Sequence, residues 1–211
     1  LENRTTLLAG ISHDLRTPLT RIKLTLELMP ETTESELRQS LTEDVDEIER
    51  RLREVLQLAR GVEQQEEPQL QDLGKIIIED ISDHQHDGAR IHYESVAPVV
   101  QSVPSDTLKR ILRNLLENAI RYGEQKPISV QLQQDVNGQT RICILDQGPG
   151  IPEKEREAVF RPFYRLENSR SQATGGSGLG LAIVQQLCIA QGWKITLQAH
   201  HEGGTAACLE L

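Results

Sequence analysis

The chain has 211 residues, which is enough for one or two domains with an ordinary hydrophobic core. Its 32 acidic and 23 basic residues leave a net charge of -9, which disfavours nonspecific binding to nucleic acid or to anionic membranes. Because it contains one Trp, three Tyr and two Phe, aliphatic side chains must build the core.

The first 30 residues show the spacing of an amphipathic helix that ends at Pro30. No run of about 18 apolar residues marks a membrane span, and no signal peptide opens the chain. Because Leu1 already lies inside the helical pattern without a capping residue, we expect the chain to begin partway through a longer protein. The apolar stripe consists of Leu8, Leu15, Leu19, Ile22, Leu26 and Met29.

A histidine, His13, lies on this helix in the segment Ser-His-Asp-Leu-Arg-Thr-Pro-Leu. It precedes Leu15 by two positions and should therefore point roughly 160° away from the buried stripe. Asp14 can accept a hydrogen bond from one ring nitrogen, which leaves the other nitrogen free to act as a nucleophile near pH 7. Thr17 shares the face of His13, and Pro18 removes a backbone donor and bends the helix. A lone histidine of this kind is usually an ordinary exposed residue, so its function depends on the rest of the chain.

A second amphipathic segment, from Leu41 to Ala59, follows a short polar turn and predicts an antiparallel helical hairpin. Two facing stripes alone make a thin core, so we expect two copies to pair as a homodimeric four-helix bundle. The acidic, Gln-rich segment 63–68 is typical of a linker. The predicted domains are therefore 1–62 and 69–211.

Helices and strands are mixed beyond Pro68. The pattern predicts an α+β sandwich, with helices against one face of a mixed or antiparallel sheet. A hairpin turn is expected at Asn137-Gly138. The predicted helices begin at Leu73 and span 105–122, 153–160 and 178–190, and the predicted strands span 90–96, 128–132, 142–146, 194–199 and 205–211.

The three cysteines, Cys143, Cys188 and Cys208, are odd in number and show no CxxC spacing. They lie in apolar surroundings. We therefore expect buried free thiols, as in a reducing cytosol, and no metal site made by them.

Two asparagines, Asn114 and Asn118, lie four positions apart on one helix face, with Arg121 and Tyr122 one turn later. Asparagine is unfavourable in an apolar helix unless its amide finds a partner. Mg2+ takes oxygen ligands and usually bridges phosphates, which suits two amide oxygens. A capping or buried polar role is an equal alternative at this point.

Asp146 ends an apolar strand and is followed by Gly148 and Gly150. A carboxylate in this position can accept a hydrogen bond from an exocyclic amine such as that of adenine. The glycines allow the backbone to approach a ring closely. Alone, Asp-x-Gly-x-Gly is also typical of many turns.

A glycine-rich segment opens the last predicted helix, where backbone N–H groups make an anion site. It lacks the Gly-x4-Gly-Lys pattern of a P-loop, and Leu181 replaces the small residue of a dinucleotide fingerprint. The polar segment 165–174 before it is expected to cover phosphates as a lid, with Arg165 and Arg170 available for their charge. The glycines are Gly175, Gly176, Gly178 and Gly180.

Together these segments resemble the cytoplasmic catalytic core of a sensor histidine kinase, closest to the EnvZ-like kinases of two-component systems. Five motifs occur in the family's order and cover essentially the whole chain. Gln147 departs from the pattern, because an acidic residue or Asn is common there. The segments are 12–21 (H box), 114–122 (N box), 146–150 (G1 box), 160–165 (F box) and 176–181 (G2 box).

The resemblance implies a GHKL-type ATP-binding domain that uses ATP and Mg2+, with the metal held through Asn118 and Asn114 and adenine bound by Asp146. It implies phosphorylation of His13 and transfer of the phosphoryl group to an aspartate of a response-regulator receiver domain, docking near 20–25. The catalytic set implied is His13, Asp14, Arg16 and Thr17, the last linked to dephosphorylation of the regulator. The nucleotide-binding set is Asn114, Asn118, Arg121, Tyr122, Asp146, Gly148, Gly150, Phe163, Arg165, Arg170, Gly176, Gly178, Leu179 and Gly180.

The resemblance also implies a homodimer with no nucleic-acid partner. The fragment would be cytoplasmic and make no membrane contact itself, whereas the full-length protein would be anchored in the inner or plasma membrane. Two alternatives stay open. The protein can be mainly a response-regulator phosphatase or an ATP-binding scaffold. It can also be another GHKL ATPase, of the chaperone or mismatch-repair type, which leaves the helix of His13 unexplained.

Overall fold

The computed structural model describes residues 19–20, 22, 24–26, 39, 41–43, 45–46, 48, 66–86, 88–166, 177–201 and 203–211. The chain divides into two compact units, Leu1–Gly61 and Val62–Leu211. Across the described ranges, every helix is too short or too polar to cross a lipid bilayer.

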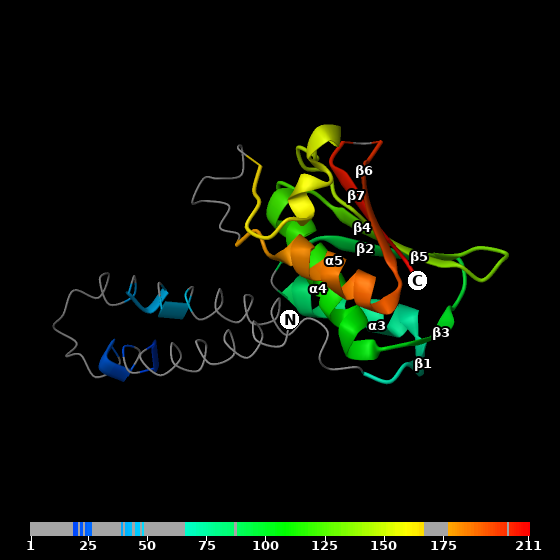
Figure 1. Ribbon diagram of the computed structural model, residues 1–211, viewed down its shortest axis with the longest axis horizontal. Helices are drawn as coiled ribbons and strands as arrows, with labels where there is room; N and C mark the ends of the chain where they lie inside the picture. Colours follow the sequence, from blue (N-terminus) through cyan, green and yellow to red (C-terminus); the bar gives the residue numbers. More distant parts are fainter. Residues whose placement is uncertain are drawn as a thin grey trace. The chain divides into compact units, whose positions relative to one another are not determined.

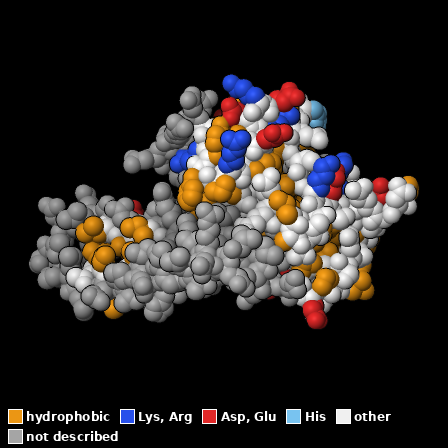
Figure 2. Space-filling model, in the orientation of Figure 1, with side chains coloured by type: hydrophobic (Ala, Val, Ile, Leu, Met, Phe, Trp, Pro, Cys, Tyr) orange, Lys and Arg blue, Asp and Glu red, His pale blue; other side chains and the backbone are white. Residues whose placement is uncertain are grey.

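The described residues of the N-terminal unit are all helical. Leu19, Leu26 and Val45 are buried together in one apolar cluster, as expected for two helices with facing stripes. Ile22 and Ile48, which the spacing places on the same stripes, are 48% and 50% exposed. Figure 2 shows apolar side chains at the surface of this unit. The unit therefore presents apolar surface that its own described residues do not cover.

The C-terminal unit is built on a five-stranded sheet with the order β2-β4-β5-β7-β6. The strands β2 and β4 are parallel, and the other neighbouring pairs are antiparallel. The expected mixed sheet is confirmed, and so is the turn at Gly138, whose φ is 84°. The strands are β2 (Ile91–Ser95), β4 (Ile128–Gln134), β5 (Thr140–Leu145), β6 (Lys194–Ala199) and β7 (Thr205–Glu210).

Three helices cover one face of this sheet: α3 (Leu73–His86), α4 (Ser105–Tyr122) and α5 (Gly180–Gln191) (Figure 1). The observed bounds of α4 are those predicted from its apolar spacing. Its apolar stripe packs against the inward side chains of the central strands, of which Ile142 and Leu209 are 1% and 0% exposed. The buried residues of α4 are Thr107, Leu108, Ile111, Leu112, Leu115, Leu116 and Ala119.

The first turn of α4 is capped from the segment expected to be a linker. The carboxylate of Glu66 accepts hydrogen bonds from the backbone N–H groups of Asp106, at 3.0 and 3.1 Å, and Thr107, at 3.2 Å. These groups have no partner within the helix, and a negative charge is stabilising at a helix N-terminus. Glu66 therefore ties the described part of this segment, residues 66–68, to α4.

A second, two-stranded sheet was not predicted. Its strands are β1 (Gln69–Asp72) and β3 (Val100–Val103), which pair antiparallel. Both are short, and Leu70 and Val100 are 75% and 55% exposed, so neither strand carries a clear alternation of buried and exposed residues. The pairing joins segments far apart in sequence, which local patterns do not indicate.

The helix predicted over 153–160 is wrong. Two short 3-10 turns occupy the segment, η1 (Glu153–Glu155) and η2 (Ala158–Phe160). Only Val159 and Phe160 are buried there. Without a longer apolar stripe to bury, an α-helix gains too little from tertiary packing to persist.

The expectation of three free thiols is also wrong. Cys143 on β5 and Cys208 on β7 form a disulfide, with their Cα atoms 4.1 Å apart, and only Cys188 is a buried free thiol. The two bridged residues are direct partners in the antiparallel register. The sequence does not reveal this register, so it gives no sign that the two cysteines meet.

Truncation of the α4 core should destabilise the C-terminal unit. Leu108 is 0% exposed and Leu70 is 75% exposed, so the same Leu→Ala change tests burial alone. We expect Leu108→Ala to lower the free energy of unfolding by about 2 to 5 kcal/mol and Leu70→Ala by less than about 0.5 kcal/mol. Urea unfolding followed by circular dichroism measures both. Equal losses would contradict the assigned core.

Candidate nucleotide-binding site

Asp146 directly follows the last residue of β5 and is 8% exposed. Its Oδ1 atom accepts hydrogen bonds from the backbone N–H groups of Gly148, at 2.9 Å, and Thr205, at 3.1 Å. Its own N–H donates to the carbonyl oxygen of Thr205 at 3.0 Å, and the Thr205 hydroxyl also hydrogen-bonds to the carboxylate. The carboxylate is therefore fixed in position at the end of the sheet.

The ionisation of this carboxyl group is governed by its burial. Burial raises the pKa of Asp146 above its ordinary value of 3.8, and the hydrogen bonds from Gly148 and Thr205 oppose this shift. A buried carboxylate with a raised pKa at the edge of a site is a strong acceptor that gains from a donor supplied by a ligand.

The turn between β6 and β7 encloses the backbone of Asp146. Gly204 has a φ of +89°, and a Cβ atom on it would lie 2.2 Å from the Asp146 carbonyl oxygen. The Nδ1 atom of His200 lies 3.2 Å from that oxygen and 3.2 Å from the carbonyl oxygen of Gly203. Because both partners are acceptors, Nδ1 must carry the proton. The predicted strands 194–199 and 205–211 place a turn here, but sequence reasoning missed that Gly204 and His200 contact Asp146.

The C-terminal end of α4 meets the loop after Asp146. A Cβ atom on Gly148 would lie 2.1 Å from the carbonyl oxygen of Tyr122, and one on Gly123 would lie 3.6 Å from the Cβ of Asp146. Lys126 donates from Nζ to the carbonyl oxygen of Gln147 at 3.0 Å. Only glycine at position 148 allows the helix end and the strand end to come this close.

The two asparagines of α4 face the first residue of α5. A Cβ atom on Gly180 would lie 3.1 Å from Oδ1 of Asn114 and 3.6 Å from Nδ2 of Asn118. Asn114 donates from Nδ2 to the carbonyl oxygen of Arg110 at 2.8 Å, which leaves its amide oxygen toward α5. The Nδ2 atom of Asn118 is buried and has no hydrogen-bond partner among the described residues. A buried amide without a partner is costly, so Asn118 is suited to a ligand.

The segment around Phe163 is joined to the segment that opens α5. The N–H of Phe163 donates to the carbonyl oxygen of Gly178 at 2.9 Å. Phe163 is 66% exposed and has a φ of 64°, a strained conformation for an aromatic residue. Gly178 has a φ of 73°, and a Cβ atom on it would lie 2.9 Å from the carbonyl oxygen of Tyr164. The two segments therefore fit together only with glycine at position 178.

The structure brings most of the described candidate residues to one end of the unit, where α4, the loop after β5 and the start of α5 meet. Arg121, Tyr122 and Arg165 are half-buried and Leu179 is fully buried. Gly150 has a φ of 74°, and a Cβ atom on it would lie 3.0 Å from the carbonyl oxygen of Gly204. The candidates outside the described residues are His13, Asp14, Arg16, Thr17, Arg170 and Gly176.

Neighbouring glycines in the β6–β7 turn allow a matched test of the site. Gly203 and Gly204 both have a φ near +90°, but only Gly204 has atoms within 4 Å of a built Cβ. We expect Gly204→Ala to displace Asp146 and weaken binding of an ATP analogue more than tenfold. Gly203→Ala carries the same backbone strain of about 1 kcal/mol and should leave the affinity within twofold. Calorimetric titration measures the affinity of each variant. Similar affinities would refute the close packing of Gly204 against Asp146.

Two protein families match this chain in non-overlapping segments. Residues 3–64 match the His Kinase A (phospho-acceptor) domain. Residues 104–211 match the histidine kinase-, DNA gyrase B-, and HSP90-like ATPase. The second match contains every described candidate residue of the site.

The chain is also similar to individual proteins. It is 33% identical to the sensor histidine kinase GtrS of Pseudomonas aeruginosa over 100% of this chain and 42% of that protein. It is 34% identical to the sensor protein RstB of Escherichia coli over 94% of this chain and 46% of that protein. The chain thus spans less than half the length of these relatives. The full-length ShkA structure in complex with AMPPNP shares the fold, with a TM-score of 0.79, 22% identity and coverage of 97% of this chain and 45% of ShkA.

Proposed function

Because the chain belongs to the sensor histidine kinases, in which a phospho-acceptor domain precedes a histidine kinase-like ATPase domain, we propose that it phosphorylates itself on His13 from ATP. The observation that carries the proposal is the buried and fixed carboxylate of Asp146 at the C-terminal end of α4, the helix that carries the asparagine pair. Histidine kinase-like ATPase domains bind ATP. Asp146 can accept a hydrogen bond from the nucleotide, and the asparagines can supply amide oxygens to its metal ion. We propose that residues 1–62 form the acceptor domain, residues 63–68 the linker and residues 69–211 the ATP-binding domain.

In the ATP-binding domain, Asp146 would accept a hydrogen bond from the exocyclic amine of adenine. Gly148 and Gly150 would let the loop backbone approach the ring. The backbone N–H groups at the start of α5 would bind phosphate oxygens, because they lie at the positive end of the helix. The remaining proposed nucleotide contacts are Arg121, Tyr122, Phe163, Arg165, Arg170, Gly176, Gly178, Leu179 and Gly180.

The asparagine pair of α4 would hold a magnesium ion through its amide oxygens. Asn114 presents an amide oxygen toward Gly180. The Nδ2 atom of Asn118 is a buried donor without a partner in the described part of the chain, so it would donate to a phosphate oxygen while the amide oxygen serves the metal. Amide oxygens are hard ligands of the kind Mg2+ takes. When bound, the ion would neutralise phosphate charge during transfer.

In the acceptor domain, the neutral imidazole of His13 would attack the γ-phosphorus of ATP while the bond to ADP breaks. Asp14 would hold the ring tautomer by accepting its other N–H. Arg16 would offer positive charge to the phosphoryl oxygens. Thr17, four residues after His13, would position the water that hydrolyses the aspartyl phosphate of the partner and releases inorganic phosphate.

The His Kinase A domain implies dimerisation and a response-regulator partner. We propose a homodimer with a four-helix bundle, because Ile22, Leu41 and Ile48 are 48%, 38% and 50% exposed in a single chain. The phosphoryl group would pass from His13 to an aspartate of a receiver domain docked near 20–25. We also propose that the fragment acts in the cytoplasm as part of a membrane-anchored protein.

Incubation with γ-labelled ATP and Mg2+ tests the proposal. A phosphorylated imidazole is a phosphoramidate, so the label should be lost in acid and retained in alkali. Acid-stable label would point to a hydroxyl acceptor and refute His13. Absence of label together with rapid dephosphorylation of a phosphorylated receiver domain would support the alternative of a dedicated phosphatase.

A further inference from the structure

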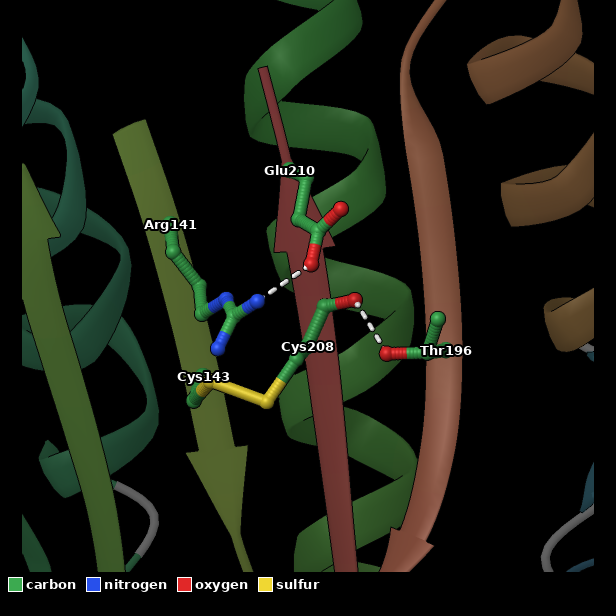
Figure 3. Close-up of a disulfide and its surroundings, with 5 residues drawn as sticks. All are labelled: Arg141, Cys143, Thr196, Cys208 and Glu210. Atoms are coloured by element: carbon green, nitrogen blue, oxygen red, sulfur yellow. Dashed lines mark hydrogen bonds and ion pairs between the residues drawn. A yellow bond between two sulfur atoms is a disulfide. The ribbon is translucent and has the colours of Figure 1, made fainter. Parts of the chain in front are cut away.

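Two cysteines face each other across the central strands of the C-terminal unit. Cys143 and Cys208 are direct partners in the β5–β7 ladder, 65 residues apart in sequence, with their Cα atoms 4.1 Å apart. A disulfide joins them (Figure 3). The sheet register sets this pairing.

The disulfide lies on the face of the sheet that the helices do not cover. The neighbouring pair, Ile142 and Leu209, points to the helices and is buried, and side chains alternate between the two faces of a strand. Cys143 is half-buried, whereas Cys208 is 7% exposed. On the same face, Arg141 pairs with Glu210 beside the disulfide (Figure 3). Cys143 is therefore partly open to solvent on this face.

The same two strands hold the adenine-binding candidate. Asp146 lies three residues after Cys143, and Thr205 lies three residues before Cys208. Beyond the disulfide, the ladder continues through the pair Leu145 and Ala206 and ends in the hydrogen bonds between Asp146 and Thr205. A covalent link at Cys143 opposes separation of the strand ends that fix the carboxylate.

We propose that Cys143 and Cys208 form a reversible thiol–disulfide site that tunes nucleotide affinity through the shared strands β5 and β7. This inference rests on the proposed binding of ATP at Asp146. The oxidised form keeps the Asp146–Thr205 contact closed more of the time. The reduced form opens it more often, and affinity falls with the closed fraction.

The chemistry balances with a peroxide as oxidant and a dithiol as reductant. The thiolate of Cys143 attacks one oxygen of hydrogen peroxide, forming a sulfenic acid and releasing hydroxide, which takes up the proton lost by the thiol and leaves as water. The thiol of Cys208 then attacks that sulfur, forming the disulfide and releasing a second water. In the reverse direction, one thiolate of a dithiol attacks the Cys143 sulfur, so that Cys208 leaves as a thiolate and a mixed disulfide forms. The second thiolate of the dithiol then attacks the reductant's own sulfur, Cys143 leaves as a thiolate, and the reductant becomes a disulfide.

The third cysteine serves as an internal control. Cys188 is 1% exposed, and burial raises the pKa of its thiol to about 12. It therefore remains a protonated and inert thiol at neutral pH. Replacement by alanine should leave the redox response intact.

Thiol counting on the full chain tests the site itself. After treatment with hydrogen peroxide, removal of excess oxidant and denaturation, a chromogenic thiol reagent should detect one thiol per chain, and after phosphine reduction three. Cys143→Ser should show two thiols under both conditions. Reduction should lower the Tm of the C-terminal unit by about 5 to 15 °C in the native chain and in Cys188→Ala. Three thiols after mild peroxide treatment would overturn the proposal.

Titration of the oxidised and reduced chains with an ATP analogue tests the coupling. We expect the reduced chain to bind about two- to tenfold more weakly, and Cys143→Ser and Cys143→Ala/Cys208→Ala to show no redox difference. Equal affinities of the two native forms would overturn the coupling. Absence of binding in both forms would overturn the proposed function and the coupling with it, while the thiol count would still decide whether the disulfide forms.

Discussion

The chain carrying His13→Ala should incorporate no label from γ-labelled ATP, whereas the native chain becomes labelled. The reason is that alanine removes the only group proposed to attack phosphorus. The proposed nucleotide site lies in a separate compact unit, Val62–Leu211, so affinity for an ATP analogue should stay within twofold. Autoradiography after gel electrophoresis and calorimetric titration measure the two quantities.

His92 provides the matched control for this experiment. It lies on β2 and is exposed, so His92→Ala removes an imidazole without touching the proposed site. We expect native labelling from this chain. Label that persists in His13→Ala would show that another residue is the acceptor, and loss of nucleotide binding in that chain would show that the two units do not act independently.

The second large effect is expected from Asp146→Asn. The Oδ1 atom of Asp146 already accepts two backbone N–H groups, so an asparagine oxygen would take that place and its NH2 group would face the ligand. The adenine amine would then meet a donor instead of an acceptor. Loss of a charged hydrogen bond and an unpaired buried donor together cost about 2 to 4 kcal/mol, which corresponds to about 30- to 1,000-fold weaker binding of ATP.

The same substitution should not destabilise the folded protein at neutral pH. Burial raises the pKa of Asp146 above 3.8, so its ionised form is disfavoured by folding. Its contribution to stability is present below pH 3.8 and is lost as the pH rises through the raised pKa. At pH 7 the native chain therefore carries a buried charge that Asp146→Asn lacks.

Thermal unfolding without nucleotide measures this effect. We expect the Tm of Asp146→Asn to equal or exceed that of the native chain at pH 7, and the difference to shrink as the pH falls toward 3.8. Burial also raises the pKa of Asp80. Because both chains contain Asp80, its effect on the pH dependence of Tm is the same in both and does not alter the difference. A lower Tm for the variant at pH 7 would mean that the hydrogen bonds of Gly148 and Thr205 to the charged form outweigh the effect of burial.

The sequence identified the parts of the site that lie in continuous segments. Asn114, Asn118 and Gly180 were singled out by spacing and composition, and the structure places them together. His200 and Gly204 were missed, although His200 contacts Asp146 across 54 residues. Histidine and glycine are common in turns, so their presence does not indicate a site. Their role here depends on which strand end the turn contacts.

Local periodicity by itself determined the helices and strands that carry a long apolar stripe or a clear alternation. The bounds predicted for α4 and β6 agree with Ser105–Tyr122 and Lys194–Ala199. The helix α4 buries one face along most of its length, and Ile195 and Leu197 alternate with polar residues in β6. Tertiary structure alone decided the pairing of β1 with β3, the parallel neighbours β2 and β4, and the Cys143–Cys208 disulfide. Each joins segments distant in the chain, and strand register and partner choice depend on the whole core, which no local pattern encodes.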